Sequence, residues 1–169
     1  MNIRAATIED MRGMAQIAYE AWLWAYSGFM PESEIELHCG PEKRIQRWTE
    51  TWEDMATRLV AVDDAGQVVG FAIEARTPGF PEAESEIAAL YVHPNSSGSG
   101  VGRLLVSEMV AVFRSKGSES MAIHTLAQNM IGRSFYEKMG GIIGAEAEWN
   151  GYPSVWYVWR DLSCFGSCT

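Results

Sequence analysis

The sequence predicts an α/β (mixed α+β) protein built around a central, twisted, mixed β-sheet of about seven strands with helices on both faces. Strands alternate with helices through the second half of the chain, and a run of three strands precedes them, which is typical of a mixed sheet. No repeat, low-complexity tract or linker divides the 169 residues. A chain of this length suits one domain, which we expect over residues 1–162, followed by a C-terminal tail over residues 163–169.

The first third of the chain predicts one strand and two helices. Residues 2–6 have a β-like composition, and Thr7 is a candidate helix N-cap with two acidic residues in the following turn. Apolar side chains then recur at helical spacing, at Met11, Met14, Ile17, Ala18, Ala21 and Trp22. Pro31 and the pair Gly40-Pro41 interrupt the pattern, and a second helix is expected over residues 42–54.

The remaining elements follow from alternating patterns and from turn residues. A turn at 63–66 and the pair Asn150-Gly151 predict two hairpins, and Gly117 is well placed to end a helix. Residues 76–83 contain two prolines and a glycine and are expected to form a loop. In chain order we expect strands over 58–62, 67–75 and 86–92, a helix over 101–116, a strand over 120–125, a helix over 129–139, and strands over 142–149 and 152–160.

Composition excludes several classes of function. The net charge of −9 argues against a nucleic-acid binder, because such proteins present a basic face, and it weakly favours a cationic partner. No apolar run reaches the roughly 18 residues of a membrane span, and the N-terminus is not typical of a signal peptide, so we expect a cytoplasmic protein. The three cysteines Cys39, Cys164 and Cys168 have no metal-ligand spacing, so free thiols and no metal site are expected.

A glycine-rich segment between a predicted strand and a predicted helix is the main candidate for ligand binding. It reads Ser97-Gly98-Ser99-Gly100-Val101-Gly102-Arg103. Glycines allow a sharp turn and close approach to a ligand, and the N–H groups of a helix start can hold a pyrophosphate. The glycine spacing differs from GxGxxG, because Arg103 stands where the third glycine belongs, and no lysine follows as in a P-loop.

The neighbourhood of this segment resembles the central acetyl-CoA motif of the GNAT N-acetyltransferases. Leu90-Tyr91-Val92-His93-Pro94 precedes the glycines, and Leu104-Leu105 follows them. Gly100 and Gly102 match the family's glycines, while Ser97 stands where the family has Gln or Arg, so one side-chain contact is missing but the backbone cradle remains. The resemblance implies a single-domain GNAT fold in which this segment binds acetyl-CoA, and it is specific because a second motif supports it.

The second motif lies in the predicted helix over residues 129–139. Asn129, then a small residue at Gly132, then Phe135-Tyr136-Glu137-Lys138-Met139-Gly140 is similar to the second GNAT motif, although Ala is usual at the position of Gly132. The stretch from Ala21-Trp22 to Arg47-Trp48 is also similar to a bacterial branch of small-molecule and uncharacterised members. The resemblance therefore extends over nearly the whole chain.

Acetyl transfer to an amine needs a base, because an alkylammonium with a pKa near 10.4 must lose a proton before it attacks. Glu86 is the candidate: in register with Leu90-Tyr91-Val92, it matches the catalytic glutamate of the histone-acetyltransferase branch. A solvent-facing charge at a strand start is the alternative interpretation. Glu84 and Glu74 are the competing carboxylates.

The resemblance also implies roles on the cofactor side. Tyr136 is the candidate acid that protonates the departing CoA thiolate, and a core aromatic is the alternative. Asn129 is expected to bond the CoA arm or, alternatively, to cap its helix. The backbone of Leu90 and Val92 is expected to hold the pantetheine. His93 and His124 are expected to be structural.

The expected acceptor is a small-molecule amine, with a small cationic amine favoured, or a peptide amine. Aromatic residues on the acceptor side can hold an alkylammonium by cation–π contact, although most tryptophans in proteins pack in the core. They are Trp22, Trp24, Tyr26, Phe29, Trp149, Tyr152, Trp156, Tyr157 and Trp159, with Glu32, Glu34 and Glu36 nearby in sequence. The alternative function is a catalytically weak acyl-CoA sensor or interaction module. A homodimer is expected by analogy with the fold.

Overall fold

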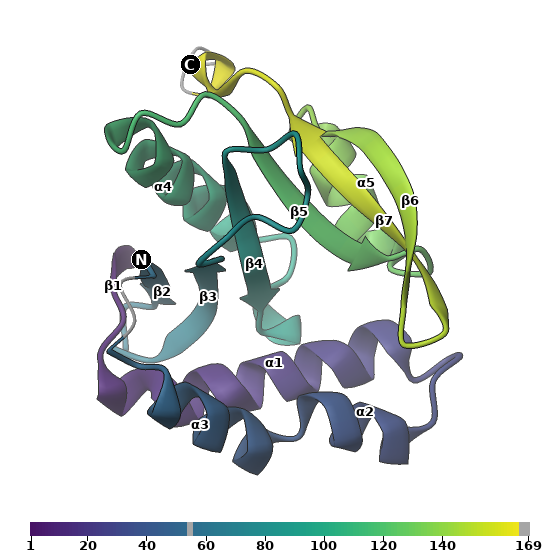
Figure 1. The fold of residues 1–169 in the computed structure, drawn as a ribbon. Coiled ribbons are helices and arrows are strands. Elements are labelled where there is room, and N and C mark those ends of the chain that lie inside the picture. The colour runs from purple at the N-terminus through teal and green to yellow at the C-terminus, as the bar shows by residue number, and fades with distance from the viewer. Residues whose placement is uncertain (54–55, 166–169) are drawn as a thin grey trace. The chain divides into compact units, whose positions relative to one another are not determined.

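The structure, a computed structural model, describes residues 1–53 and 56–165, except for the side chain of Cys164. Within these ranges seven strands form a mixed sheet in the order β1-β2-β3-β4-β5-β7-β6 (Figure 1). The predicted sheet is therefore confirmed. Cys168 and most of the expected tail lie outside the described residues.

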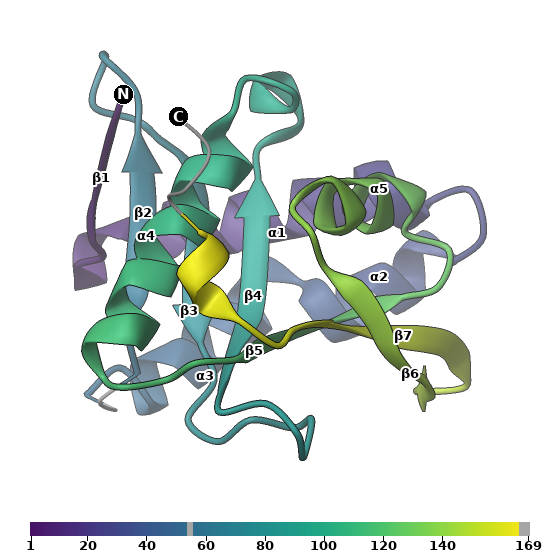
Figure 2. The same cartoon turned by 90° about the horizontal axis from the view of Figure 1, so that it is seen from above.

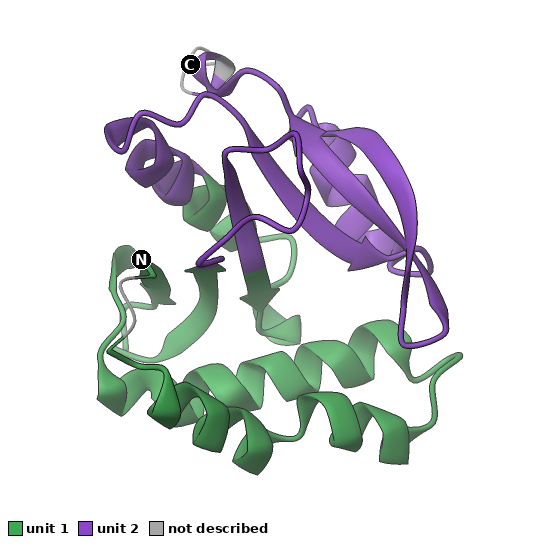
Figure 3. Cartoon of the chain, viewed as in Figure 1, with its two compact units in different colours: residues 1–73, 89–106 green, residues 74–88, 107–169 purple. Residues whose placement is uncertain are grey.

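The helices and strands have the following bounds. The strands are β1 (Asn2–Ala5), β2 (Arg58–Val62), β3 (Val68–Glu74), β4 (Ser85–Val92), β5 (Met121–Leu126), β6 (Ile142–Trp149) and β7 (Tyr152–Trp159). The helices are α1 (Met11–Tyr26), α2 (Glu32–Cys39), α3 (Pro41–Glu50), α4 (Val101–Ser115) and α5 (Met130–Lys138). The chain forms two compact units, residues 1–73 with 89–106 and residues 74–88 with 107–169, so β4 and α4 each run from one unit into the other (Figure 3).

Unit 1 holds the antiparallel ladder of β1, β2 and β3, in which Ile3 pairs with Ala61 and Leu59 pairs with Ala72. Helices lie on both faces of β3. Gly70 faces α4, since a Cβ at Gly70 would lie 3.0 Å from the Val101 side chain. The next residue, Phe71, faces the opposite side, where its ring meets the ring of Trp48 on α3 edge-on at 5.7 Å.

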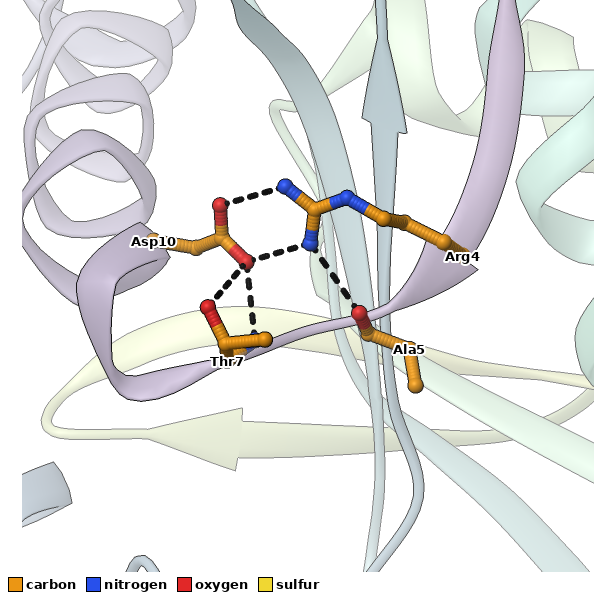
Figure 4. A network of polar contacts seen from close by, with 4 residues as sticks. All are labelled: Arg4, Ala5, Thr7 and Asp10. Carbon is orange, nitrogen blue, oxygen red and sulfur yellow. Dashed lines mark hydrogen bonds and ion pairs between the residues drawn. The ribbon is translucent and has the colours of Figure 1, made fainter.

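Thr7, the predicted N-cap, caps the 3-10 turn Ile8–Asp10 in a capping box with Asp10, and an ion pair of Asp10 adds to this contact. The two terminal nitrogens of Arg4 donate to the two carboxylate oxygens of Asp10 at 2.6 and 2.8 Å (Figure 4). Asp10 also accepts from the backbone N–H of Thr7 at 2.8 Å. Together these contacts join β1 to the 3-10 turn Ile8–Asp10 that leads into α1.

Unit 2 is built on β5, which pairs in parallel with β4 on one side and antiparallel with β7 on the other. Ser85 pairs with Met121 and Glu86 with Ala122. His124 pairs with Trp156, and Ile123 pairs with Tyr157. Since side chains alternate along a strand, Glu86, His124 and Trp156 share one face, and Tyr157 lies on the opposite face.

The opposite face of β7 is covered by α5, which lies along β5 and β7 (Figure 2). The Tyr136 ring meets the Tyr157 ring at 5.4 Å and the Trp159 ring edge-on at 6.3 Å. The indole N–H of Trp159 donates to the backbone oxygen of Met139 at 2.9 Å. The face of Glu86 is covered instead by the β3–β4 loop, whose Phe80 packs in a cluster with Ala122 and Val158.

One helix was missed by the sequence analysis. Residues 32–39 form α2, whose buried apolar side chains are Ile35 and Cys39. The helix expected over residues 42–54 is observed as α3, which begins at Pro41 and ends at Glu50. The expected hairpin turn at Asn150-Gly151 is confirmed, with φ values of 47° and 81°. Gly117 also has a positive φ, 90°, two residues after Ser115, where α4 ends.

Candidate active site

The glycine-rich segment lies in unit 1, between the end of β4 and the start of α4. A 3-10 turn, Pro94–Ser96, leaves the strand, and His93 stabilises it by accepting the Asn95 N–H at its Nδ1. Gly98 and Gly100 have φ values of 78° and 92°, a region that favours glycine. Residues 97–100 are exposed. The two glycines therefore turn an open loop into the helix.

The first turn of α4 presents N–H groups that have no partner in the helix. The first helical bond runs from the Leu104 N–H to the Gly100 oxygen at 3.1 Å. The N–H groups of Val101, Gly102 and Arg103 precede it, and such groups point out of a helix N-terminus together with the positive end of the helix dipole. This arrangement suits a phosphate or pyrophosphate group.

The strand that leads to this loop is held by its tyrosine. The Tyr91 hydroxyl accepts a hydrogen bond from the Trp22 indole N–H at 2.8 Å. Its ring lies 5.6 Å from the Arg44 guanidinium carbon and 5.4 Å from the Phe71 ring. Leu90 and Val92 are half-buried and, by strand alternation, point away from Tyr91. The side chain of Tyr91 therefore fixes β4 from one face of the strand, and the side chains of Leu90 and Val92 lie on the other face.

Glu86 lies in unit 2 at the start of β4, and only 8% of its surface is exposed. Its Oε2 accepts the backbone N–H of Gly79, in the β3–β4 loop, at 2.6 Å. Burial raises the pKa of the Glu86 carboxyl group, and the Gly79 hydrogen bond opposes this rise. Among the described residues, no cation and no second hydrogen-bond donor contacts this carboxylate.

The competing carboxylates have other partners. Glu74 pairs with Lys116, whose Nζ lies 2.6 Å from Glu74 Oε2. Glu84 is exposed and accepts the Glu119 backbone N–H at 2.6 Å. Glu86 thus differs from Glu74, which has a cation beside it, and from Glu84, which is exposed.

Aromatic rings lie beside Glu86 on the same face of the sheet. A Cβ at Gly79 would lie 2.9 Å from Cη2 of Trp156 and 3.4 Å from Oε2 of Glu86, so both groups border one point in space. The Trp156 ring stacks on the His124 ring at 4.3 Å and 17°. Burial lowers the pKa of His124, and its Nε2 lies 2.8 Å from the Ser154 hydroxyl.

Asn129 is the N-cap of α5. Its Oδ1 accepts the Gly132 N–H at 3.0 Å, and its Nδ2 donates to the Thr125 hydroxyl at 2.9 Å. A Cβ at Gly132 would lie 2.5 Å from Asn129 Nδ2, so the cap leaves little space for a side chain there. Tyr136, two turns into this helix, is 6% exposed and packs on Tyr157 and Trp159.

The predicted site residues fall into two groups. Leu90, Tyr91, Val92 and the segment Ser97–Arg103 belong to unit 1, and Glu86, Asn129 and Tyr136 belong to unit 2. Within unit 2, Glu86 and Tyr136 lie on opposite faces of the strands, as the register of β7 shows.

The contacts that surround Glu86 were not predicted from the sequence. Gly79 was placed in a loop, His124 was expected to be structural, and Trp156 was one of many aromatic candidates. The signal available for Gly79 was its position in the run Pro78-Gly79-Phe80-Pro81, which predicts a loop but no partner.

Two features are absent from the residues that the structure describes. No cluster of three or more His, Cys, Asp or Glu side chains with the geometry of a metal site occurs in them. No helix among them has both the length and the apolar character needed to cross a bilayer.

Comparison with known proteins identifies the family. Residues 16–141 match the acetyltransferase (GNAT) family, and the chain belongs to it. The chain is therefore an acetyl-CoA-dependent N-acetyltransferase. It is 26% identical to spermidine N(1)-acetyltransferase of Thermoplasma acidophilum over 144 residues, which covers 83% of this chain and 87% of that protein. It is 28% identical to a mycothiol acetyltransferase of Arthrobacter sp. (strain FB24) over 72% of this chain, but it spans only 38% of that protein.

Solved structures show the same fold. The PaiA N-acetyltransferase of Thermoplasma acidophilum, solved in complex with coenzyme A, superposes with a TM-score of 0.73 at 24% identity, over 92% of this chain and 96% of that one. A GCN5-related N-acetyltransferase from Rhodopseudomonas palustris gives a TM-score of 0.75 at 19% identity, over 93% of each chain. The predicted GNAT fold is confirmed.

Proposed function

We propose that this enzyme transfers the acetyl group of acetyl-CoA directly to a small cationic amine, with Glu86 as the general base. The observation that carries the proposal is the environment of Glu86, a carboxylate that is 8% exposed and has the Gly79 N–H as its hydrogen-bond donor. A buried carboxylate with a raised pKa holds a proton more readily than an exposed one, as a base near neutral pH must.

On the donor side, the glycine-rich segment and the start of α4 supply the phosphate contacts. The N–H groups of Gly98 and of residues 100–103 would hold the pyrophosphate of acetyl-CoA, since the Ser99 N–H already donates to the Ser96 oxygen. The backbone of Leu90 and Val92 would hold the pantetheine. Both serines of the segment, Ser97 and Ser99, are exposed, and Ser99 Oγ donates to the Ser96 oxygen at 2.6 Å. Because the cradle is backbone, the absence of Gln or Arg at Ser97 leaves it in place.

The chemical step requires proton transfers at nitrogen and at sulfur. The amine must first be neutral, and deprotonating an alkylammonium at pH 7 costs roughly 4 to 5 kcal/mol in water. The nitrogen then attacks the thioester carbon, the N–C bond forms, the C–S bond breaks, and CoA leaves as a thiolate. Glu86 takes the first proton from nitrogen, and the second is released as the amide forms. Sulfur gains a proton, for which Tyr136 is the donor that the family resemblance implies, although its ring lies on the opposite face of the strands from Glu86.

A cationic acceptor is supported by charge and by the nearest aromatic ring. The chain has a net charge of −9, and Glu86 has no cation beside it among the described residues. The Trp156 ring and the Glu86 carboxylate both lie within 3.4 Å of the position that a Cβ at Gly79 would take. An indole ring can hold an alkylammonium by cation–π contact. One relative, matched over 87% of its own length, is a spermidine N(1)-acetyltransferase.

The test is CoA release from acetyl-CoA with a panel of polyamines, amino acids, aminoglycosides and short peptides. We expect turnover with the polyamines, and a lower turnover for Glu86→Gln and for Tyr136→Phe while acetyl-CoA still binds. Unchanged turnover in both variants would refute the assigned roles. Binding of acetyl-CoA with no turnover on any amine would instead support a sensor, and light scattering on the same sample tests the expected homodimer.

A further inference from the structure

One backbone N–H of the β3–β4 loop, that of Gly79, donates to the carboxylate of the proposed base. The Gly79 N–H lies 2.6 Å from Glu86 Oε2, seven residues away along the chain. The first residue of the loop also contacts β4, because the Ala75 N–H donates to the Glu86 backbone oxygen at 2.9 Å. The loop therefore forms a strap that returns over the side chain of Glu86.

We propose that the backbone N–H of Gly79 is a positioning group for catalysis, which holds one oxygen of Glu86 so that the other is presented to the acceptor amine. The proposal rests on the assignment of Glu86 as the base. A carboxylate oxygen fixed by a short charge-assisted hydrogen bond loses rotational freedom, and the remaining oxygen then has a defined direction.

Glycine is required at position 79 by its surroundings and not by its backbone. A Cβ would lie 2.9 Å from Cη2 and 3.3 Å from Cζ2 of Trp156, which is closer than side chains pack. Unlike Gly98 or Gly100, Gly79 has no positive φ. Alanine is therefore excluded only by the Trp156 ring.

The Trp156 ring has little freedom to move away from the strap. It stacks on His124 at 4.3 Å and lies 5.8 Å from the Phe80 ring at 40°. His124 is in turn bonded to Ser154, which is 1% exposed. A side chain at position 79 would therefore push the strap, and the Gly79 N–H with it, away from Glu86.

The hydrogen bond also sets the pH at which Glu86 acts. It stabilises the ionised carboxylate, so its loss raises the pKa of Glu86 further above the ordinary value. The ionisable groups on the neighbouring elements are His124 on β5, Arg76, Glu82 and Glu84 in the loop, and Glu74 on β3. Glu74 pairs with Lys116, Glu82 with Arg160, and Glu84 with the Glu119 N–H. None of these ionisable groups is a cause of the shift at Glu86: burial raises its pKa, and the Gly79 hydrogen bond lowers it.

The experiment is a double-mutant cycle that combines Gly79→Ala with Trp156→Phe, read from the pH profile of kcat/KM on the amine that the panel identifies. We expect Gly79→Ala alone to move the acidic limb upward by about one pH unit and to lower kcat/KM roughly tenfold. Trp156→Phe removes the outer indole ring that contains Cη2. In that background Gly79→Ala should shift the limb by less than half as much, because the strap can return to Glu86.

The controls separate this inference from the proposed function. Gly13→Ala, on α1, places a Cβ at an ordinary 3.9 Å from Val68 and should leave the profile unchanged. Glu86→Gln should abolish the acidic limb; if it does not, the base assignment fails. If Glu86→Gln abolishes the limb but Gly79→Ala leaves it in place, Glu86 is the base and the positioning role of Gly79 is refuted. If Gly79→Ala does not fold, the double variant Gly79→Ala/Trp156→Phe is compared with the single variant Trp156→Phe. If the acidic limb of the double variant lies a full pH unit above that of the single variant, the role of the Trp156 contact is refuted.

Discussion

Asn129 and Gly132 are joined by a hydrogen bond of 3.0 Å from the Gly132 N–H to Asn129 Oδ1, which begins helix α5. The amide nitrogen of Asn129 donates to Thr125 at 2.9 Å. Both ends of this amide thus have protein partners. A contact to CoA, if Asn129 makes one, uses the second hydrogen of Nδ2 or the second lone pair of Oδ1.

Two substitutions of Asn129 separate the cap from a CoA contact. Asn129→Ala removes the cap and should lower the free energy of unfolding by about 1 kcal/mol, as measured by urea denaturation. Asn129→Asp keeps the capping oxygen but removes the donor, so stability should stay within about 0.5 kcal/mol while acetyl-CoA affinity falls. Gln128→Ala, an exposed neighbour, serves as the control. Normal acetyl-CoA affinity in the aspartate variant would leave Asn129 with the capping role alone.

The fold could largely be predicted because its signals are local. Alternation, helical spacing and the pair Asn150-Gly151 depend on residues close in sequence, and the structure confirms the elements that they predicted. Helix α2 escaped detection because its apolar stripe consists of Ile35 and Cys39. The two breakers that flank it, Pro31 and Gly40, were interpreted only as interruptions of the helical pattern, whereas they are its N-cap and C-cap.

The site could be predicted only in part. Glu86 was found because a resemblance fixed its register relative to Leu90. Its donor Gly79 was not found, because the hydrogen bond depends on how the β3–β4 loop folds back over the strand. The stacking of His124 on Trp156 likewise depends on the register of β5 against β7, which no local pattern determines.

The Arg4–Asp10 pair should make stability depend on pH at its acidic end. Hydrogen bonding to Arg4 holds the pKa of Asp10 below its ordinary value. The pair therefore stabilises the fold above the unfolded pKa of about 3.9, and this stabilisation is lost as the pH falls through the lower folded pKa. Asp10→Asn should cost about 2 kcal/mol at pH 7 and progressively less below pH 4, by urea denaturation.

The matched control for Asp10 is Asp64→Asn. Asp64 pairs with the N-terminal amine, but its side chain is 94% exposed. Solvent screens such a pair, so we expect no measurable change in stability. Equal losses in the two variants would show that burial of Asp10 has no part in the effect.

Gly141 should tolerate no larger residue, because Trp159 lies against it. A Cβ there would lie 2.6 Å from Cζ2 of Trp159, whose indole also bonds the Met139 oxygen. Gly141→Ala should therefore lower the free energy of unfolding by about 1 to 3 kcal/mol. Gly28→Ala, with nothing within 4 Å of its Cβ, should change it by less than about 0.5 kcal/mol. An equal effect at both positions would exclude the Trp159 contact as the cause.

Glu86 should reduce stability at the pH where it supports catalysis. Burial is the main cause that raises its pKa, so the folded state holds the Glu86 proton more tightly than the unfolded state does. Stability therefore falls as the pH rises from the unfolded pKa through the raised folded pKa, and the full penalty remains at higher pH.

Glu86→Gln removes this buried charge and keeps an oxygen for the Gly79 N–H. At pH 8 it should raise the free energy of unfolding by about 1 kcal/mol while turnover falls, and at pH 4, where Glu86 is protonated in the wild type, the two proteins should be equally stable. Glu84→Gln, at an exposed carboxylate, should change stability little at either pH. If the glutamine variant is less stable than wild type at pH 8, a cation or a second donor stabilises the Glu86 carboxylate in solution. Burial would then not be the main influence on the pKa of Glu86, and the argument that burial prepares it to act as the base would fail.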